Sequence, residues 1–142
     1  MKKLVFCVLI SAGTLLTSNV YSATYPGQAC EKKFGGELYR TSTYAQNTSS
    51  STINITCPFD RLKDGGTGSA TAVVYFVNDG KNKTCYFDNF NIDTGGLGKW
   101  TSTSGVRRLV LPKINPTIRW SPFVINCSLP PNSKITGYYL AE

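Results

Sequence analysis

The stretch IRWSPFVINCSLPPNSKITGYYL, residues 118–140, predicts the two strands that close an all-β fold. Every second residue of 123–129 is apolar, as side chains on the buried face of a strand must be: Phe123, Ile125, Cys127 and Leu129. The Pro-Pro-Asn-Ser sequence of residues 130–133 then predicts a turn. Strand-forming residues follow it at Ile135, Tyr138, Tyr139 and Leu140.

The residues just before this pattern have the opposite parity. Ile118 and Trp120 share even positions, whereas the inward residues of 123–129 are odd-numbered. Proline cannot donate to a strand ladder and is tolerated at bulges and edges. We therefore expect a bent strand or a bulge near Ser121 and Pro122, with Trp120 in the core.

The rest of the chain has the same β character. Residues 52–57 alternate, with Ile53, Ile55 and Cys57 on one face. Residues 70–77 are apolar at both parities, which is typical of a central strand covered on both faces. Asn78-Asp79-Gly80 predicts a hairpin that would place Cys85 on the neighbouring strand.

Other segments complete this pattern. Residues 23–36 are interpreted as an irregular lead-in, 37–44 as a first strand, 45–51 as a polar loop, 94–98 as a break and 106–111 as a further strand. About seven short strands separated by turns predict a two-sheet antiparallel sandwich, immunoglobulin-like or jelly-roll-like.

Four cysteines lie beyond the N-terminal segment: Cys30, Cys57, Cys85 and Cys127. An even number in an exported chain predicts two disulfides, and four cysteines allow three pairings. We favour Cys30 with Cys57 and Cys85 with Cys127, because each pair could link strands in a separate half of the chain. A zinc site is the alternative, but the chain has no CxxC and no histidine.

The N-terminus has the features of a secretory signal. Lys2 and Lys3 precede an apolar run at residues 4–16 that is too short to span a membrane. Val20 and Ser22 suit the positions before a cleavage site. We therefore expect a signal peptide at residues 1–22, whose removal also removes Cys7, and one domain at residues 23–142. The alternative is a noncleaved anchor. We expect an exported protein, periplasmic or extracellular, with no transmembrane segment after cleavage.

The composition argues against several function classes. The formal net charge is +7, but the basic residues are scattered and no recognisable nucleic-acid module is present, so a nucleic-acid partner is not expected. Without histidine, the usual general base of serine and cysteine nucleophiles is missing. We expect no cofactor, no metal and no catalytic residues.

Acidic residues leave two alternatives open. A carboxylate pair drawn from Asp60, Asp88 and Asp93 would suit glycoside hydrolysis, although most aspartates, including Asp64 and Asp79, lie beside Gly or Asn where they serve turns. Residues 88–93 cluster oxygen ligands as a calcium loop does, but they fail the EF-hand pattern. A solvated strand face or turn is the simpler interpretation.

Exposed aromatic residues are the best candidates for a binding surface. Trp100 is expected to lie in a loop rich in Gly, Ser and Thr and is the first candidate for a ligand platform, with Tyr44 and Tyr86. The alternative for the aromatic residues as a set is core packing. Glycosylation sequons occur at Asn47, Asn54, Asn82 and Asn126, the last beside Cys127 in a strand expected to be buried.

Three cysteine-containing segments carry a resemblance. ITCPF at residues 55–59, KTCYF at 83–87 and INCSLPPNSKITGYYLAE at 125–142 resemble a group of small exported bacterial β-sandwich proteins, mostly of unknown function, with an ITCP…C…CxxPP…Y pattern. The short MKK signal is of bacterial type. The resemblance covers nearly all of residues 23–142 and implies the sandwich fold, but it transfers no catalytic residue.

These observations favour a non-enzymatic module. The first hypothesis is an exported β-sandwich that binds a surface, a glycan or a protein partner. The alternative is a structural subunit of a surface fibre or assembly, with an edge strand open to strand addition. A carboxylate-based hydrolase is the third hypothesis.

Overall fold

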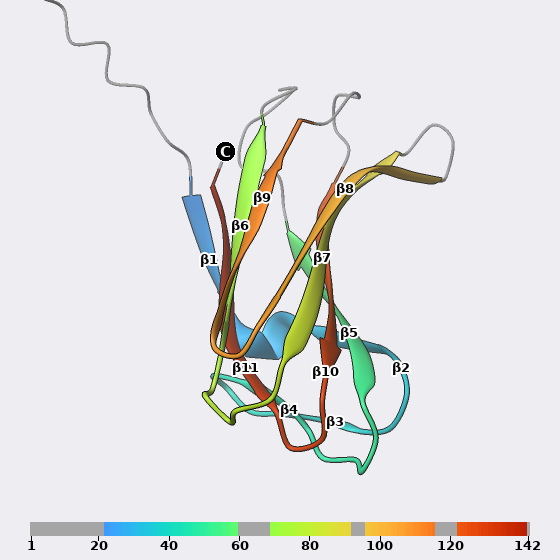
Figure 1. Cartoon of the computed structure of the whole chain (residues 1–142), viewed down its shortest axis with the longest axis vertical. Coiled ribbons are helices and arrows are strands. Elements are labelled where there is room, and N and C mark those ends of the chain that lie inside the picture. The colour runs from blue at the N-terminus through green and yellow to red at the C-terminus, as the bar shows by residue number, and fades with distance from the viewer. Residues whose placement is uncertain (1–21, 60–68, 92–95, 116–121, 142) are drawn as a thin grey trace, which may run out of the picture.

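Two antiparallel β-sheets lie face to face in the computed structural model, which describes residues 22–59, 69–91, 96–115 and 122–141 (Figure 1). The all-β sandwich predicted from the sequence is therefore confirmed. Residues 1–21 of the predicted signal peptide, Ile118, Trp120 and the expected bend at Ser121 lie outside the described residues. In the parts of the chain that are described, no helix has the length and apolar character needed to cross a membrane.

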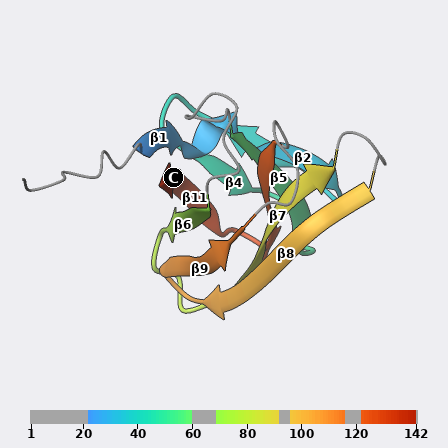
Figure 2. The same cartoon turned by 90° about the horizontal axis from the view of Figure 1, so that it is seen from above.

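Sheet A contains six strands in the order β3 (Leu38–Arg40), β4 (Ala45–Asn47), β11 (Lys134–Ala141), β6 (Ala70–Phe76) and β9 (Arg108–Ile114), with β1 (Ser22–Pro26) also paired to β11. Sheet B contains five strands in the order β2 (Glu31–Phe34), β5 (Ile53–Phe59), β10 (Phe123–Leu129), β7 (Lys83–Asn91) and β8 (Gly96–Gly105). A short 3₁₀ helix, η1 (Gly27–Ala29), joins β1 to β2. Figure 2 looks down on the two layers.

The strand pairing is that of a jelly roll. β4 pairs with β11, β5 with β10, β6 with β9 and β7 with β8, and these pairs alternate between sheets A and B. The chain thus forms one long antiparallel hairpin that is wrapped into two sheets. Of the two sandwich types expected, the topology is jelly-roll-like.

This wrapping overturns the hairpin expected at Asn78-Asp79-Gly80. β6 belongs to sheet A and β7 to sheet B, so the loop between them crosses from one layer to the other. The turn chemistry is present, because the Asp79 Oδ1 accepts the Lys81 N–H at 3.0 Å. A local turn signal does not reveal which sheet the next strand joins.

The segments assigned by weaker patterns also differ. The lead-in of residues 23–36 contains β1, η1 and β2, the expected first strand is only β3, and the polar loop of 45–51 begins with β4. These strands are only three to five residues long, and such short pairings leave little periodicity to read.

The inward faces of β5 and β10 follow the predicted alternation. Ile53, Ile55 and Cys57 are buried, as is the odd-numbered set of 123–129. In β11 the register shifts between Ile135 and Gly137, so the buried residues change from odd to even and Tyr138 rather than Tyr139 points inward.

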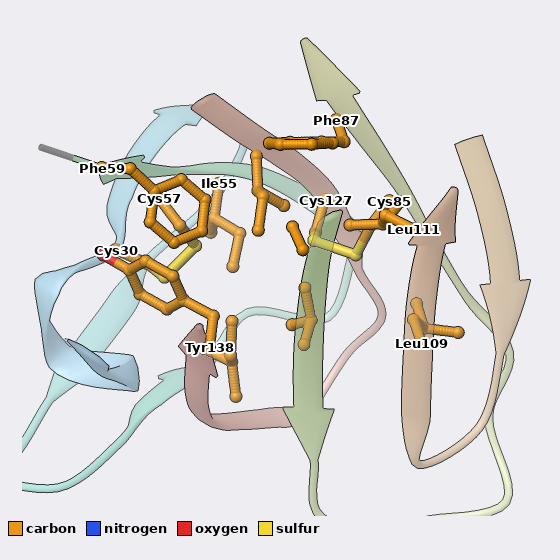
Figure 3. Close-up of a cluster of buried hydrophobic side chains, with 14 of the residues drawn as sticks. Cys30, Ile55, Cys57, Phe59, Cys85, Phe87, Leu109, Leu111, Cys127 and Tyr138 are labelled. Carbon is orange, nitrogen blue, oxygen red and sulfur yellow. A yellow bond between two sulfur atoms is a disulfide. The ribbon is translucent and has the colours of Figure 1, made fainter. Parts of the chain in front are cut away.

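Tyr138 is the centre of an aromatic cluster in the core (Figure 3). Its ring stacks on Tyr25 at 5.2 Å and meets Phe59 edge-on at 4.9 Å. Its hydroxyl donates to the carbonyl of Pro58 at 3.0 Å. The large ring is thus buried while its hydroxyl keeps a hydrogen bond. These contacts join strands of both sheets.

Both predicted disulfides are present, Cys30–Cys57 and Cys85–Cys127. Cys85 and Cys127 lie directly opposite each other on β7 and β10. Cys30 immediately precedes β2 and is bonded to Cys57 on β5, the strand with which β2 pairs. All four cysteines are buried, and both bonds therefore join adjacent elements of sheet B on its inner face (Figure 3).

Asn47 is a buried polar residue whose hydrogen bonds stabilise the turn between β10 and β11. Its Nδ2 donates to the carbonyls of Ser51 and Leu129 at 2.7 and 2.8 Å, and its Oδ1 accepts the Ser49 N–H at 2.9 Å. Because the amide is fully buried and engaged, the Asn47 sequon cannot carry a glycan in the folded protein.

Loops at one end of the sandwich meet around the buried ammonium of Lys83, the first residue of β7. The ammonium is ion-paired with Asp79 and donates to the carbonyl of Val106 at 3.0 Å. Asp79 in turn accepts a hydrogen bond from Ser133 in the β10–β11 turn. This Asp79–Lys83 cluster links the β6–β7, β8–β9 and β10–β11 connections.

Candidate ligand-binding site

The register of sheet B brings polar and aromatic residues together on its outer face. Because Cys85 and Cys127 pair on the inner face, their neighbours Tyr86 and Asn126 face each other on the outer one. Two residues further along β7, Asp88 lies opposite Trp100 of β8. These four residues occupy three adjacent strands, β10, β7 and β8 (Figure 1).

A bulge sets the position of Trp100. Asp88 pairs with Trp100 but Phe90 pairs with Leu97, so β8 has one extra residue over this interval. A Cβ on Gly98 would lie 2.3 Å from the side-chain oxygen of buried Asn89, so the bulge requires glycine there. Bulges re-aim side chains at sheet edges, and Trp100 belongs to an edge strand rather than to the loop expected from its Gly- and Ser-rich surroundings.

Tyr86 and Trp100 form an open aromatic pair. They are diagonal neighbours across β7 and β8, since Tyr86 lies opposite Ser102. The ring centroids are 6.2 Å apart and the planes are tilted by 56°. The two residues are 42% and 60% exposed. Such exposure is uncommon for residues that usually pack in cores, so this pair is the first candidate for contact with a ligand.

A chain of hydrogen bonds runs beside the rings. Thr56 Oγ1 donates to Asn126 Oδ1, and Asn126 Nδ2 donates to Asp88 Oδ2, each at 2.8 Å. This arrangement fixes the orientation of the Asn126 amide and keeps Asp88 as an acceptor. Ligand hydroxyl or N–H groups are the natural donors to such a carboxylate.

Asp88 is only 5% exposed, and its electrostatics follow from that burial. Burial raises the pKa of Asp88 above its ordinary value of 3.8, and the hydrogen bond from Asn126 and the nearby Lys33 ammonium offset this only in part. Lys33 belongs to β2, in which the register also shifts, between Lys32 and Phe34. Buried carboxylates with raised pKa values are enriched at functional sites.

The five residues Lys33, Tyr86, Asp88, Trp100 and Asn126 line a hollow of about 280 Å³. Its size is near the lower limit for small-molecule sites. A lining that combines two aromatic rings with a carboxylate, an amide and an ammonium suits a ligand with both apolar faces and hydroxyl groups.

Asp88→Asn should make the fold more stable at pH 7. An acid whose pKa is raised in the folded state destabilises that state wherever the carboxylate is ionised, and the effect vanishes below the unfolded pKa, where both states are protonated. The gain in thermal midpoint should therefore disappear as the pH falls through the raised pKa of Asp88 toward 3.8. Thermal unfolding of both proteins from pH 7 to pH 3 measures it. Lower stability of the variant at pH 7 would contradict the assignment.

The sequence-predicted platform is brought together only in part. Tyr86 and Trp100 lie side by side, whereas Tyr44 immediately precedes β4 of sheet A and has the Lys134 ammonium over its ring at 4.8 Å. Asp60, Asp64 and Asp93 lie outside the described residues, so neither the carboxylate pair nor the calcium loop can be placed. Among the described residues, no three His, Cys, Asp or Glu side chains cluster as metal ligands would.

Two residues of the site, Lys33 and Asn126, were not among the sequence-predicted site residues, and Asp88 was a candidate only for a carboxylate pair or a calcium loop. Asn126 was expected to be buried beside Cys127, but it faces outward, as its even parity requires. The parities of Cys85 and Cys127 were the available signal, because a bonded cross-strand pair puts residues 86 and 126 opposite each other on the other face.

A second surface hollow has fewer groups suited to binding a ligand. It measures about 420 Å³, lies beside β3 and has one aromatic ring among its lining residues, the 55% exposed Tyr39. Its other described lining side chains contain no buried carboxylate. The Tyr86–Trp100 hollow is therefore the better candidate.

Comparison with known proteins establishes the fold alone. No protein-family model and no curated protein match the sequence. Among solved structures, the chain is similar to part of the glycosylation-associated protein (Gap123) complex from Streptococcus agalactiae, with a TM-score of 0.56 and 10% identity over 89% of this chain and 26% of that one. It therefore spans about a quarter of that protein's length. The C-terminal CBM6 of the laminarinase LamC from Zobellia galactanivorans gives a TM-score of 0.49 and 5% identity over 86% of this chain and 100% of that one.

Proposed function

We propose that the protein is an exported, non-enzymatic module that binds a glycan on the outer face of sheet B. The observation that carries the proposal is the exposed, tilted Tyr86–Trp100 pair beside the buried Asp88 carboxylate. Sugar rings combine C–H faces, which pack on aromatic rings, with hydroxyls, which hydrogen-bond to carboxylates and amides. Both kinds of partner lie in one hollow.

The polar groups of the site support a hydroxyl-rich ligand over a purely apolar one. Asp88 accepts hydrogen bonds, and the Lys33 ammonium donates them. The Thr56–Asn126–Asp88 chain holds the acceptors in place before a ligand arrives, which reduces the ordering cost of binding. Two disulfides suit a chain that folds in an oxidising compartment outside the cytoplasm.

Trp100→Ala should weaken glycan binding about 30-fold, roughly 2 kcal/mol, because truncating an aromatic anchor at the centre of a binding site has effects of this size. Tyr86→Ala should act in the same direction. Tyr39→Ala is the matched control, since it removes from sheet A a ring whose exposure of 55% lies between those of Tyr86 and Trp100. A glycan array identifies a ligand, and isothermal titration calorimetry then measures the affinities. Absence of any bound glycan, or equal losses for the Trp100 and Tyr39 variants, would contradict the proposal.

Strand β8 supports the alternative function, a subunit of a surface assembly. This ten-residue strand lies at the end of sheet B and pairs with β7 on one side, within the described residues. An edge of this length can accept a strand from another chain. Sedimentation over a range of protein concentrations tests it, and a monomer at every concentration with no partner-dependent assembly counts against it.

A further inference from the structure

Trp100 borders two hollows. One is the hollow shared with Tyr86 and Asp88, and the other, of about 530 Å³, lies toward β9 and the end of that strand. Trp100 is the residue common to both linings. A ligand packed against its indole would reach the second hollow by passing around the edge of β8.

The second hollow is lined by three side chains that hydrogen-bond to hydroxyls, beside the buried Ile114. Lys113 of β9 and the following Asn115 are exposed, and the Thr101 side chain of β8 is half-buried. An ammonium, an amide and a hydroxyl offer several donors and two acceptors. The described residues that line this hollow include no carboxylate. It therefore supplies mainly donors, whereas the first hollow contains the Asp88 carboxylate as its main acceptor.

The tilt of the aromatic rings restricts the shape of the ligand. Planes at 56° cannot both lie flat on one planar surface, so a crystalline polysaccharide face would contact only one ring by its face. A single chain can turn between successive units and meet each ring in sequence. The geometry therefore favours one separate chain over a flat array of chains.

We infer that the ligand is an extended oligosaccharide chain, bound with one part against Tyr86 and Asp88 and a following part in the hollow of Lys113 and Asn115, with Trp100 between them. This inference rests on the proposed function and adds the ligand's length and its second subsite. Lys113 and Asn115 are specificity-determining residues for chain length, since a short ligand in the first hollow does not reach them.

The test uses xylo-, manno-, cello- and laminari-oligosaccharides of two, four and six units, titrated into the whole protein by calorimetry. In the series that binds, affinity should rise about tenfold from two to six units, the effect of a few added hydrogen bonds. The double variant Lys113→Ala/Asn115→Ala should lose this gain and keep the affinity for the disaccharide. Both side chains are exposed, and an unchanged thermal midpoint confirms that the variant is folded.

Arg108→Ala is the matched control, because it removes an exposed cation from the same strand at a position where its partners are Tyr75 and Tyr139 of sheet A. It should leave the chain-length dependence intact. Equal affinity for two and six units, or equal losses for both lengths in the double variant, would overturn the second subsite while leaving the proposed function standing. Failure of every series to bind, together with no bound glycan on the array, would instead contradict the proposed function.

Discussion

Replacing both Cys85 and Cys127 with alanine should lower the free energy of unfolding by about 4 kcal/mol. The bond closes a sequence separation of 42 residues, and the stabilisation expected from restricting the unfolded chain grows with the logarithm of that length. This is a large fraction of the stability of a typical domain. Urea unfolding of the oxidised wild type and the variant measures the difference.

The Cys30→Ala/Cys57→Ala variant provides the comparison, with a separation of 27 residues and an expected loss of about 3.5 kcal/mol. The two losses should be similar in stability. Cys85 and Cys127 are adjacent to Tyr86 and Asn126, whereas Cys57 is adjacent to Thr56 and its bond to Cys30 holds the start of β2, the strand that carries Lys33. Both variants should therefore also weaken ligand binding. If the Cys85→Ala/Cys127→Ala variant lost less than about 1 kcal/mol of unfolding free energy, native packing rather than the cross-link would hold β7 against β10.

The sequence was most informative where burial imposes a strict alternation. Ile53, Ile55 and Cys57 in β5 and the odd-numbered residues of β10 are central in sheet B, and a slip by one residue would expose them all. The disulfide pairing, preferred because each pair could link strands in a separate half of the chain, is confirmed, but the sequence did not show that each bond joins paired elements of one sheet.

The wrapping of the chain was not predictable from local signals. The Asn-Asp-Gly turn has the chemistry of a hairpin, yet whether the next strand pairs with the last one or crosses to the other sheet depends on long-range partners. For β6 those partners are β9 and β11. The environment of Asp88 was not predictable for the same reason. Its side chain is hydrogen-bonded to Asn126 of β10 and it lies opposite Trp100 of β8, whose position depends on a bulge that Gly98 permits.

Asp79→Ala should destabilise the protein by about 3–5 kcal/mol, because it leaves the ammonium of Lys83 buried without its counter-charge. The remaining partners are the Val106 carbonyl at 3.0 Å and the Phe76 ring at 5.6 Å, which do not neutralise the charge. The variant also loses the contact to Ser133 and with it the link between two loops.

A double-mutant cycle with Lys83→Met separates the charge from the loop contacts. Lys83→Met alone leaves a carboxylate that is partly exposed and still bonded to Ser133 and the Lys81 N–H, so it should cost less than Asp79→Ala. The double variant should be more stable than Asp79→Ala, since it removes the unpaired ammonium. Losses that simply add would contradict a coupled pair.

The pH dependence of stability gives an independent measurement of the same pair. Burial alone would raise the pKa of Asp79, but hydrogen bonds from Lys83, Ser133 and the Lys81 N–H outweigh it and lower the pKa from 3.8 to about 2. A depressed folded-state pKa contributes stability above the unfolded value, here about 2 kcal/mol, which is lost as the pH falls from 3.8 through 2. Asp79→Asn should remove this dependence, whereas Asp88→Asn should change stability in the opposite direction at pH 7. If both variants shifted the acid unfolding curve alike, general charge repulsion rather than these two environments would control it.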